Sequence, residues 1–210
     1  MGVRIRKEEP GDYRKVEELI RDSFWNVYRP GAYEHYVMHC FREAESFVPE
    51  LDLVMEKDGE LIGQVMYARA ELKGEGGRSL PCMTFGPICI ANGYKRQGYG
   101  KKLLEESMCR AEAMGAGVLC ITGNILFYGK SGFTVASSLG IRYEDAEEED
   151  RVVPYFLARE LKAGYLGGSP WRFREPEAYF VCDTAPEDFA AYEAGFPQME
   201  KLKLPGQLTH

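Results

Sequence analysis

The sequence has few histidines and no paired cysteines, and these shortages exclude several classes of site. Its 210 residues include three histidines, His35, His39 and His210, and six cysteines, none in a C-x-x-C pair. This spacing fits neither a zinc site nor a disulfide framework, so we expect the cysteines to be small, buried, reduced side chains. His35 and His39 lie one helical turn apart, but without an H-E-x-x-H motif or a further ligand set we interpret them as ordinary helix residues and expect no metal.

Long apolar runs and an excess of positive charge are also missing. No apolar stretch approaches the length of a membrane span, and the charged segment VRIRKEE near the start does not resemble a secretory signal. A formal net charge of -7 argues against general nucleic-acid binding. We therefore expect a cytoplasmic protein that binds neither nucleic acid nor membrane, either a monomer or a homodimer. The 45% of hydrophobic residues suffice for a substantial core.

The most informative stretch is residues 84–108, TFGPICIANGYKRQGYGKKLLEESM. The β-branched and aromatic residues of 83–90 predict a strand, and the apolar spacing in 98–114 predicts an amphipathic helix. The turn between them and the first helical turn carry four cations, Lys95, Arg96, Lys101 and Lys102. Cations are unfavourable at a helix start, because the free N–H groups there already carry partial positive charge. The pattern predicts a bound phosphate, which Gly98 and Gly100 allow to approach the backbone closely.

Three glycine-loop motifs compete for this stretch. The dinucleotide fingerprint G-x-G-x-x-G fails, because Leu103 stands at its third glycine. The nucleoside-triphosphate loop has its nearest approach at 124–131, NILFYGKS, where the first glycine is Asn and the interior is bulky and apolar. Residues 95–100, KRQGYG, resemble the acyl-CoA pyrophosphate loop [QR]-x-x-G-x-[GA] of the GNAT (GCN5-related) N-acetyltransferases, with Lys95 where that family prefers Gln or Arg.

A second motif supports the same resemblance. Asn124, Tyr128, Gly132 and Phe133 stand at nearly the spacing of the family's closing signature, N-x-x-x-x-Y-x-x-x-G-F. The F-G-P before the loop and the G-N after the next strand resemble the YhbS-like branch of the family. The two motifs occur in the family's order.

The resemblance implies an α/β (α+β) fold, in which a central mixed, mostly antiparallel twisted sheet is splayed between its fourth and fifth strands and flanked by helices. The residue patterns agree with this order of elements. They predict strands at 3–7, 51–56, 61–72, 83–90, 118–122 and 151–161. They predict helices from about 12 to the R-P-G at 29–31, at about 33–45 and at 98–114. Pro87 predicts a bulge or bend in the fourth strand, because proline cannot donate to the ladder.

We predict a GNAT domain at 1–162 and a C-terminal extension at 163–210 that packs on it and is too short to be an independent domain. In the extension, Thr184 and Glu187 at capping-box spacing predict a helix start. The acidic run 144–150 is interpreted as a solvated loop, with attraction of a cationic acceptor as the alternative.

The resemblance implies an acetyl-CoA-dependent N-acetyltransferase that transfers the acetyl group directly to a primary amine of a small molecule or peptide. It places Tyr128 as the general acid that protonates the CoA thiolate, and simple packing of this ring is the alternative. Backbone N–H groups near Ile90 are the implied oxyanion donors. The residues that the resemblance implies for CoA binding are Ile88, Cys89, Ile90, Lys95, Arg96, Gln97, Gly98, Tyr99, Gly100, Lys101 and Asn124.

Three questions stay open at this point. Residues 83–91 contain no carboxylate where some relatives carry a glutamate base, so the base is a water chain, a glutamate between Glu43 and Glu56, or unnecessary for an acceptor of low pKa. Two other functions compete: a nucleophilic Cys89, and a non-catalytic acyl-CoA-binding sensor or interaction module. The acceptor itself cannot be identified from the sequence.

Overall fold

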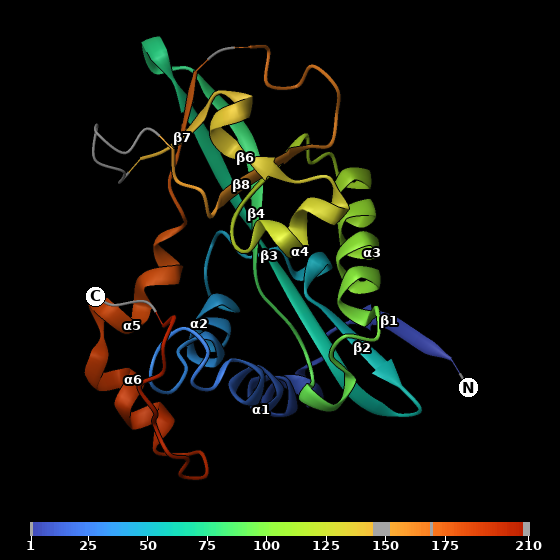
Figure 1. The fold of residues 1–210 in the computed structure, drawn as a ribbon, viewed down its shortest axis with the longest axis vertical. Helices are drawn as coiled ribbons and strands as arrows, with labels where there is room; N and C mark the ends of the chain where they lie inside the picture. The colour runs from blue at the N-terminus through green and yellow to red at the C-terminus, as the bar shows by residue number, and fades with distance from the viewer. Residues whose placement is uncertain (1, 145–151, 169, 208–210) are drawn as a thin grey trace. The chain divides into compact units, whose positions relative to one another are not determined.

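The computed structural model describes residues 2–144, 152–168 and 170–207 (Figure 1). It divides into two compact units: Met1–Met66, Pro87–Leu104 and Glu177–His210 form the first, and Tyr67–Gly86 and Glu105–Pro176 form the second. Of the predicted acidic run 144–150, all but Glu144 lies outside the described residues. The described helices include none with the length and apolarity needed to cross a membrane.

The strands pair in the order β1-β2-β3-β4-β5-β8-β6, and β9 pairs with β3 and β7. Their bounds are β1 Val3–Lys7, β2 Leu53–Lys57, β3 Glu60–Gly74, β4 Ser79–Ile90, β5 Val118–Thr122, β6 Thr134–Val135, β7 Ile141–Tyr143, β8 Phe156–Glu160 and β9 Trp171–Phe173. Strand β4 is parallel to β5, with Met83 opposite Leu119, and β7 is parallel to β9. The pairs β1–β2, β2–β3, β3–β9, β5–β8 and β6–β8 are antiparallel. The mixed, mostly antiparallel sheet predicted from the sequence is confirmed.

A group of helices lies close together in the first unit (Figure 1). They are α1 Tyr13–Phe24, α2 Glu34–Phe41, α5 Val181–Thr184 and α6 Pro186–Glu193. Ile20 of α1 and Met38 and Phe41 of α2 are fully buried. Helix α1 begins where predicted, and its Val16 and Ile20 repeat at helical spacing and are both buried, but it ends at Phe24, before the predicted end at 29–31. Helix α2 is shorter than the predicted 33–45.

The predicted capping box at Thr184 and Glu187 is wrong. Ala185 is the residue that precedes α6, and no side chain caps that helix. Thr184 instead ends α5, where its hydroxyl donates to Phe180 O at 3.2 Å and to Val181 O at 3.4 Å. The Thr184 hydroxyl therefore hydrogen-bonds to the backbone of the preceding short helix and does not cap α6.

The second unit has an apolar core built by strands from both ends of its sequence. Its members include Leu72, Cys82, Val118, Cys120, Ala136, Ile141, Phe156, Ala158, Leu166, Trp171 and Phe173. Strand β9 was not predicted, although Trp171 and Phe173 are buried and alternate with exposed Arg172. Three residues are too few for a periodic signal. The domain boundary at residue 162 stays a prediction.

Helix α3, Tyr99–Ala113, and the short helix α4, Ile125–Tyr128, complete the elements that carry predicted site residues. The predictions of a strand at 83–90 and a helix at 98–114 are confirmed, and β4 begins earlier than predicted, at Ser79. Gly86 in β4 has φ +147°, a conformation that glycine adopts readily, directly before Pro87. The predicted irregularity of this strand lies at this pair.

Candidate active site

The end of β4 lies beside the last turn of α1. The Ser23 hydroxyl donates to Ile90 O at 3.4 Å. Cys89 and Ile90 are buried, whereas Ile88 is half-buried. Gly63 on β3 also lies close to this strand end, because a Cβ built on it would lie 2.6 Å from Ile90 Cδ1. The strand end that the sequence predicts to hold the acyl-CoA amides and the oxyanion is thus held by close packing within the first unit.

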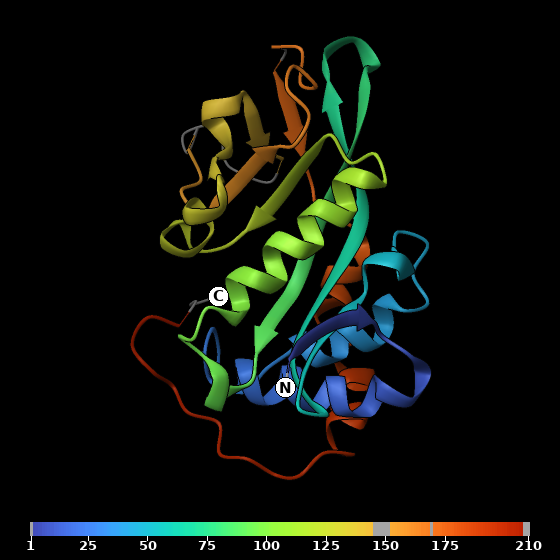
Figure 2. The ribbon, with the colours of Figure 1, turned by 90° about the vertical axis from the view of Figure 1, so that its right-hand side faces the viewer.

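The predicted phosphate loop joins the end of β4 to the start of α3 (Figure 2). Arg96 and Gly98 have φ values of +64° and +87°, so the loop contains two left-handed residues. Within the described part of the chain, a Cβ built on Gly98 would meet no heavy atom within 4 Å beyond its two chain neighbours. Helix α3 begins at Tyr99, and the first N–H groups of a helix have no acceptor within it. This combination of backbone donors, helix dipole and open space suits a phosphate.

The side chains of the loop divide into two groups. Lys95 Nζ donates to Ser23 O at 3.1 Å, and Gln97 Nε2 donates to Gly93 O at 3.1 Å. These two side chains therefore hold the loop in place. Arg96 and Lys101 are exposed. Lys95 and Gln97 are exposed as well, so all four side chains border solvent at the loop.

Residues at the β2–β3 turn also contact the loop and the start of α3. Lys57 Nζ lies 5.1 Å from the ring centroid of Tyr94 and 5.3 Å from that of Tyr99. A hydrogen bond with the Tyr99 hydroxyl raises the pKa of Lys57. The Tyr94 hydroxyl donates to Glu60 Oε2 at 2.7 Å. Tyr99 is thus engaged with this turn at the start of α3, and Gly100 follows it in the first helical turn.

Tyr128 ends α4 in the second unit and is half-buried among aromatic rings. Its ring centroid lies 4.9 Å from that of Phe127, 5.7 Å from Phe133 and 5.9 Å from Phe85. A Cβ on Gly123 would lie 2.3 Å from Tyr128 Cε2, so the ring covers this glycine. The aromatic packing that the sequence offered as an alternative is present, and it does not exclude a role for the hydroxyl.

Asn124 is the N-cap of α4. Its Oδ1 accepts a hydrogen bond from Leu126 N at 2.9 Å. The side chain is exposed and retains its amide N–H donors. Asn124 therefore orients the short helix that carries Tyr128. A contact between Asn124 and acyl-CoA would use the side-chain N–H donors.

The Cys89 thiol has the properties of an inert buried group. Burial raises its pKa to about 12. A thiolate is the nucleophilic form of cysteine, and an elevated pKa removes it at neutral pH. This argues against the nucleophilic reading of Cys89.

Glu34, which the sequence analysis did not single out, is the first residue of α2. Its Oε2 accepts the Tyr33 N–H at 2.9 Å, and burial raises the pKa of the carboxyl. The Glu34 charge also contributes to raising the pKa of Cys89, after the larger effect of burial. A carboxylate thus lies within electrostatic reach of the end of β4. Glutamate is common at helix starts, so the sequence pattern does not distinguish Glu34 as a candidate functional residue.

The glutamates predicted as possible bases, between Glu43 and Glu56, are less suitable. Glu43, Glu45 and Glu50 are exposed. Glu56 Oε1 lies 2.7 Å from Arg6 Nη2, in an ion pair that Asp12 completes.

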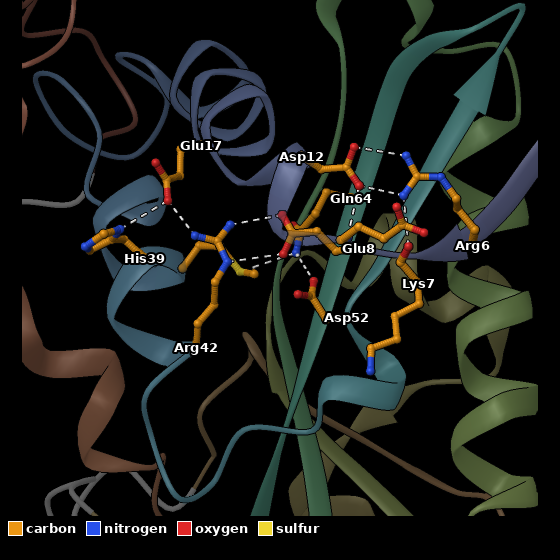
Figure 3. A network of polar contacts seen from close by, with 11 residues as sticks. Arg6, Lys7, Glu8, Asp12, Glu17, His39, Arg42, Asp52 and Gln64 are labelled. Atoms are coloured by element: carbon orange, nitrogen blue, oxygen red, sulfur yellow. Dashed lines mark hydrogen bonds and ion pairs between the residues drawn. The ribbon is translucent and has the colours of Figure 1, made fainter.

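A buried polar network occupies the region between β1, α1, α2 and β2 (Figure 3). Arg42 binds two carboxylates, Glu8 at 3.0 Å and Glu17 at 2.5 Å. Gln64 Nε2 donates to Asp52 Oδ1 at 3.3 Å. Burial, and then a hydrogen bond with Glu8, raises the pKa of Asp52 to about 9. Asp52 therefore keeps its proton at neutral pH, which lets its carboxyl lie in this interior beside Glu8.

The two helix histidines both bind carboxylates. His35 is fully buried, and its Nε2 lies 2.8 Å from Glu193 Oε2. Burial lowers its pKa to about 4. His39 Nδ1 lies 3.2 Å from Glu17 Oε1. Within the described ranges, no group of three His, Cys, Asp or Glu is arranged to hold a metal ion.

Comparison with protein families gives one match over most of the chain. Residues 4–136 match the family described as "Acetyltransferase (GNAT) domain". Among curated proteins, the chain is 24% identical over 163 residues to "Uncharacterized N-acetyltransferase YhbS" of Escherichia coli (strain K12), covering 78% of this chain and 92% of that protein. It is 28% identical over 125 residues to "Uncharacterized N-acetyltransferase YjhQ" of the same organism, covering 59% of this chain and 63% of that protein.

Two solved structures share the fold. The Escherichia coli YhbS structure in complex with CoA has a TM-score of 0.71 at 23% identity, covering 84% of this chain and 91% of that one. A GNAT family acetyltransferase from Brucella melitensis in complex with acetyl-CoA has a TM-score of 0.66 at 19% identity, covering 85% and 98%.

Proposed function

Because the chain belongs to the GNAT acetyltransferase family, we propose that it transfers the acetyl group of acetyl-CoA directly to a primary amine. The observation that carries this proposal is the left-handed Gly98 before the start of α3, with open space where a side chain would stand. Two proteins of similar fold hold CoA and acetyl-CoA, which supports the choice of cosubstrate.

The loop and the start of α3 would bind the pyrophosphate through backbone N–H groups, with Arg96 and Lys101 adding screened charge from the surface. The half-buried Ile88 and its neighbours Cys89 and Ile90 would pair with the amides of the acyl-CoA arm. The N–H near Ile90 would hydrogen-bond the developing oxyanion, a contribution of ~3 kcal/mol when the donor is preorganised.

Tyr128 would donate its hydroxyl proton to the departing thiolate. A phenol with a pKa near ~10 is protonated at neutral pH and regains its proton from solvent between turnovers. Asn124, as the cap of α4, would hold the helix that carries this tyrosine. We also propose that residues 1–162 form the acetyltransferase domain and that 163–210 form an extension packed on it.

Calorimetric titration with acetyl-CoA tests the binding half of the proposal. Gly98→Val should abolish binding, because the added side chain fills the phosphate space and disfavours the left-handed backbone. Gly93→Val is the matched control, since Gly93 lies in the same turn, also has open space around it, and has a negative φ. Equal affinities of the wild type and Gly98→Val would contradict the proposed site.

Release of free thiol from acetyl-CoA tests the catalytic half. Suitable amines are spermidine, tyramine, kanamycin and a short lysine-containing peptide, which together cover small and peptide acceptors. We expect thiol release and a matching acetylated product with at least one of them. Tight acetyl-CoA binding without release for any amine would instead identify the chain as a non-catalytic acyl-CoA sensor.

A further inference from the structure

The last turn of α1 supports the predicted phosphate loop. Asn92 Nδ2 donates to Asp22 O at 3.2 Å, and Lys95 Nζ donates to Ser23 O at 3.1 Å. The last four carbonyl groups of a helix accept no hydrogen bond within it, and they carry partial negative charge. An amide donor and a cation from the loop therefore suit this end of α1. The position of the loop depends on the position of these two carbonyl groups.

The chain directly after α1 holds a different segment, residues 196–207, termed the C-terminal strap. Asn26 Nδ2 donates to Glu200 O at 2.9 Å, and Asn26 Oδ1 accepts from Leu202 N at 3.0 Å. Gln207 Nε2 in turn donates to Asn26 O at 2.9 Å. Both ends of the Asn26 side-chain amide thus bind strap backbone, and the strap returns a side-chain donor to the same residue.

The strap is held mainly by hydrogen bonds at the surface. Phe196 is buried, whereas 197–206 are exposed and the strap contains no helix or strand. Trp25 Nε1 adds a further hydrogen bond to Glu200 O at 2.9 Å. A segment with few buried apolar contacts and exposed backbone hydrogen bonds opens at a low cost in free energy. The strap therefore has the features of a segment that alternates between a bound and a released state.

Binding of the strap also fixes the backbone directly after α1. Asn26 has φ +59°, a left-handed conformation that is uncommon for residues other than glycine but that asparagine tolerates. Its N–H donates to Gly31 O at 2.9 Å, and its Oδ1 accepts from Gly31 N at 2.8 Å as well as from Leu202 N. One oxygen thus joins the α1–α2 loop to the strap. Release of the strap removes part of what holds this conformation, close in the chain to Ser23.

We propose that binding of the strap and binding of acyl-CoA at the phosphate loop are coupled through the end of α1, which rests on the acyl-CoA site proposed above. The bound strap fixes Asn26 and the last turn of α1, whose carbonyl groups hold the Asn92 and Lys95 side chains. A loop that is already ordered loses less conformational entropy when it binds a ligand. Coupling between two sites is reciprocal, so acyl-CoA at the loop stabilises the bound strap by the same factor.

The first test is Gln207→Ala, which loosens the strap while leaving α1 and the phosphate loop intact. The substitution removes the donor to Asn26 O and the acceptor of the Leu204 N–H. Calorimetric titration with CoA should show a Kd about 5-fold or more above that of the wild type, because couplings between sites typically begin at this size. Gln198→Ala is the matched control, since Gln198 is an exposed glutamine of the same strap. This control should bind CoA like the wild type.

The second test measures the reciprocal effect in the wild type. Lys201 and Lys203 are exposed in the strap, and trypsin must lift the strap from α1 to cleave after them. When opening and closing are fast, the cleavage rate follows the population of the released state. Saturating CoA should slow cleavage after Lys201 and Lys203 by the factor found for Gln207→Ala. Cleavage after the exposed Arg78, in the β3–β4 turn of the second unit, is the internal reference and should not respond to CoA.

Equal CoA affinities of the wild type and Gln207→Ala would overturn the coupling, and so would strap cleavage that CoA does not slow. A weakening by Gln198→Ala as large as that by Gln207→Ala would exclude the contact with Asn26 as its route. If Gln207→Ala fails to fold, the cleavage experiment decides alone, because it uses the wild type. A wild type that binds no CoA would instead refute the acyl-CoA site itself.

Discussion

The ring of Tyr128 covers Gly123 so closely that a methyl group added to the glycine would lie 2.3 Å from Tyr128 Cε2. The rings of Phe85 and Phe133 contact the same tyrosine. A group that protonates a leaving atom must be held in position, and a misplacement of about 1 Å can cost on the order of 10² in rate. The absence of a side chain at residue 123 thus leaves the room that the Tyr128 ring occupies.

Gly123→Ala should therefore act on catalysis through Tyr128. The new methyl group displaces the ring, so we expect kcat to fall by roughly 10-fold to 10²-fold while acetyl-CoA affinity changes little. Gly129→Ala is a control at the other end of α4, where an added Cβ meets Ile125 at an ordinary 3.4 Å. Steady-state kinetics give kcat for both variants. Similar decreases in kcat would contradict the explanation that Gly123→Ala acts by displacing the Tyr128 ring.

Tyr128→Phe removes only the hydroxyl and keeps the aromatic packing. If the phenol is the general acid, kcat should fall by roughly 10²-fold or more with acetyl-CoA affinity nearly intact. The midpoint of thermal unfolding should change little. A variant with the wild-type rate on a good acceptor would mean that the thiolate leaves unassisted or is protonated by water.

Arg96→Ala and Lys95→Ala should weaken acetyl-CoA binding in different ways. Arg96 is exposed, so its loss should reduce affinity by a few-fold at low salt and by less as added salt screens the charge. Lys95 holds the loop through Ser23 O, so its loss should act at any salt concentration. Calorimetric titrations at low and high salt separate the effects of the two substitutions on acetyl-CoA affinity. If both affinities changed with salt in the same way, the different roles of Arg96 and Lys95 would be refuted.

Asp52→Asn should make the protein more stable in alkali. The pKa of Asp52 is about 9 in the folded protein, against about 4 for an exposed aspartate, so the folded state binds more protons between these values. Stability from this group is complete below about pH 4 and is lost as the pH rises through about 9. At pH 9 the variant should have a Tm at least ~2 °C above the wild type, with a smaller difference at pH 6. Asp58→Asn, in the exposed β2–β3 turn, is the control, and equal responses would exclude Asp52 as the cause.

The sequence predicts the elements whose signal is local. Strand β5 has the predicted bounds because 118–122 is a short apolar run between turn residues, and the start of α3 was marked by glycines and cations. The sequence did not reveal β9, whose two inward residues are recognisable only beside β3 and β7. The capping prediction at Thr184 failed because a preceding helix of four residues, α5, has almost no periodicity.

The candidate site shows the same contrast between features with a local sequence signal and features that depend on tertiary contacts. Spacing predicts a role for the glycine loop and for Tyr128, but the contact of Lys95 with Ser23 joins residues distant in the sequence. Glu34 has no motif, and its surroundings, namely burial, backbone N–H donors and the nearby charge of Arg29, come from the fold. Such features depend on tertiary packing, which no local pattern encodes.

The ion pair of Arg21 with Glu193 joins residues 172 positions apart, and the same carboxylate binds the buried His35. Helices α1 and α2 therefore leave the ribosome long before their partner in α6 exists. Until the last segment is synthesised, Arg21 lacks its carboxylate, and the face of α2 that receives Phe189 and Tyr192 is open to water. Contacts of such long range form late, so the nascent first unit passes through a period of exposed apolar surface in which aggregation or chaperone binding competes with folding.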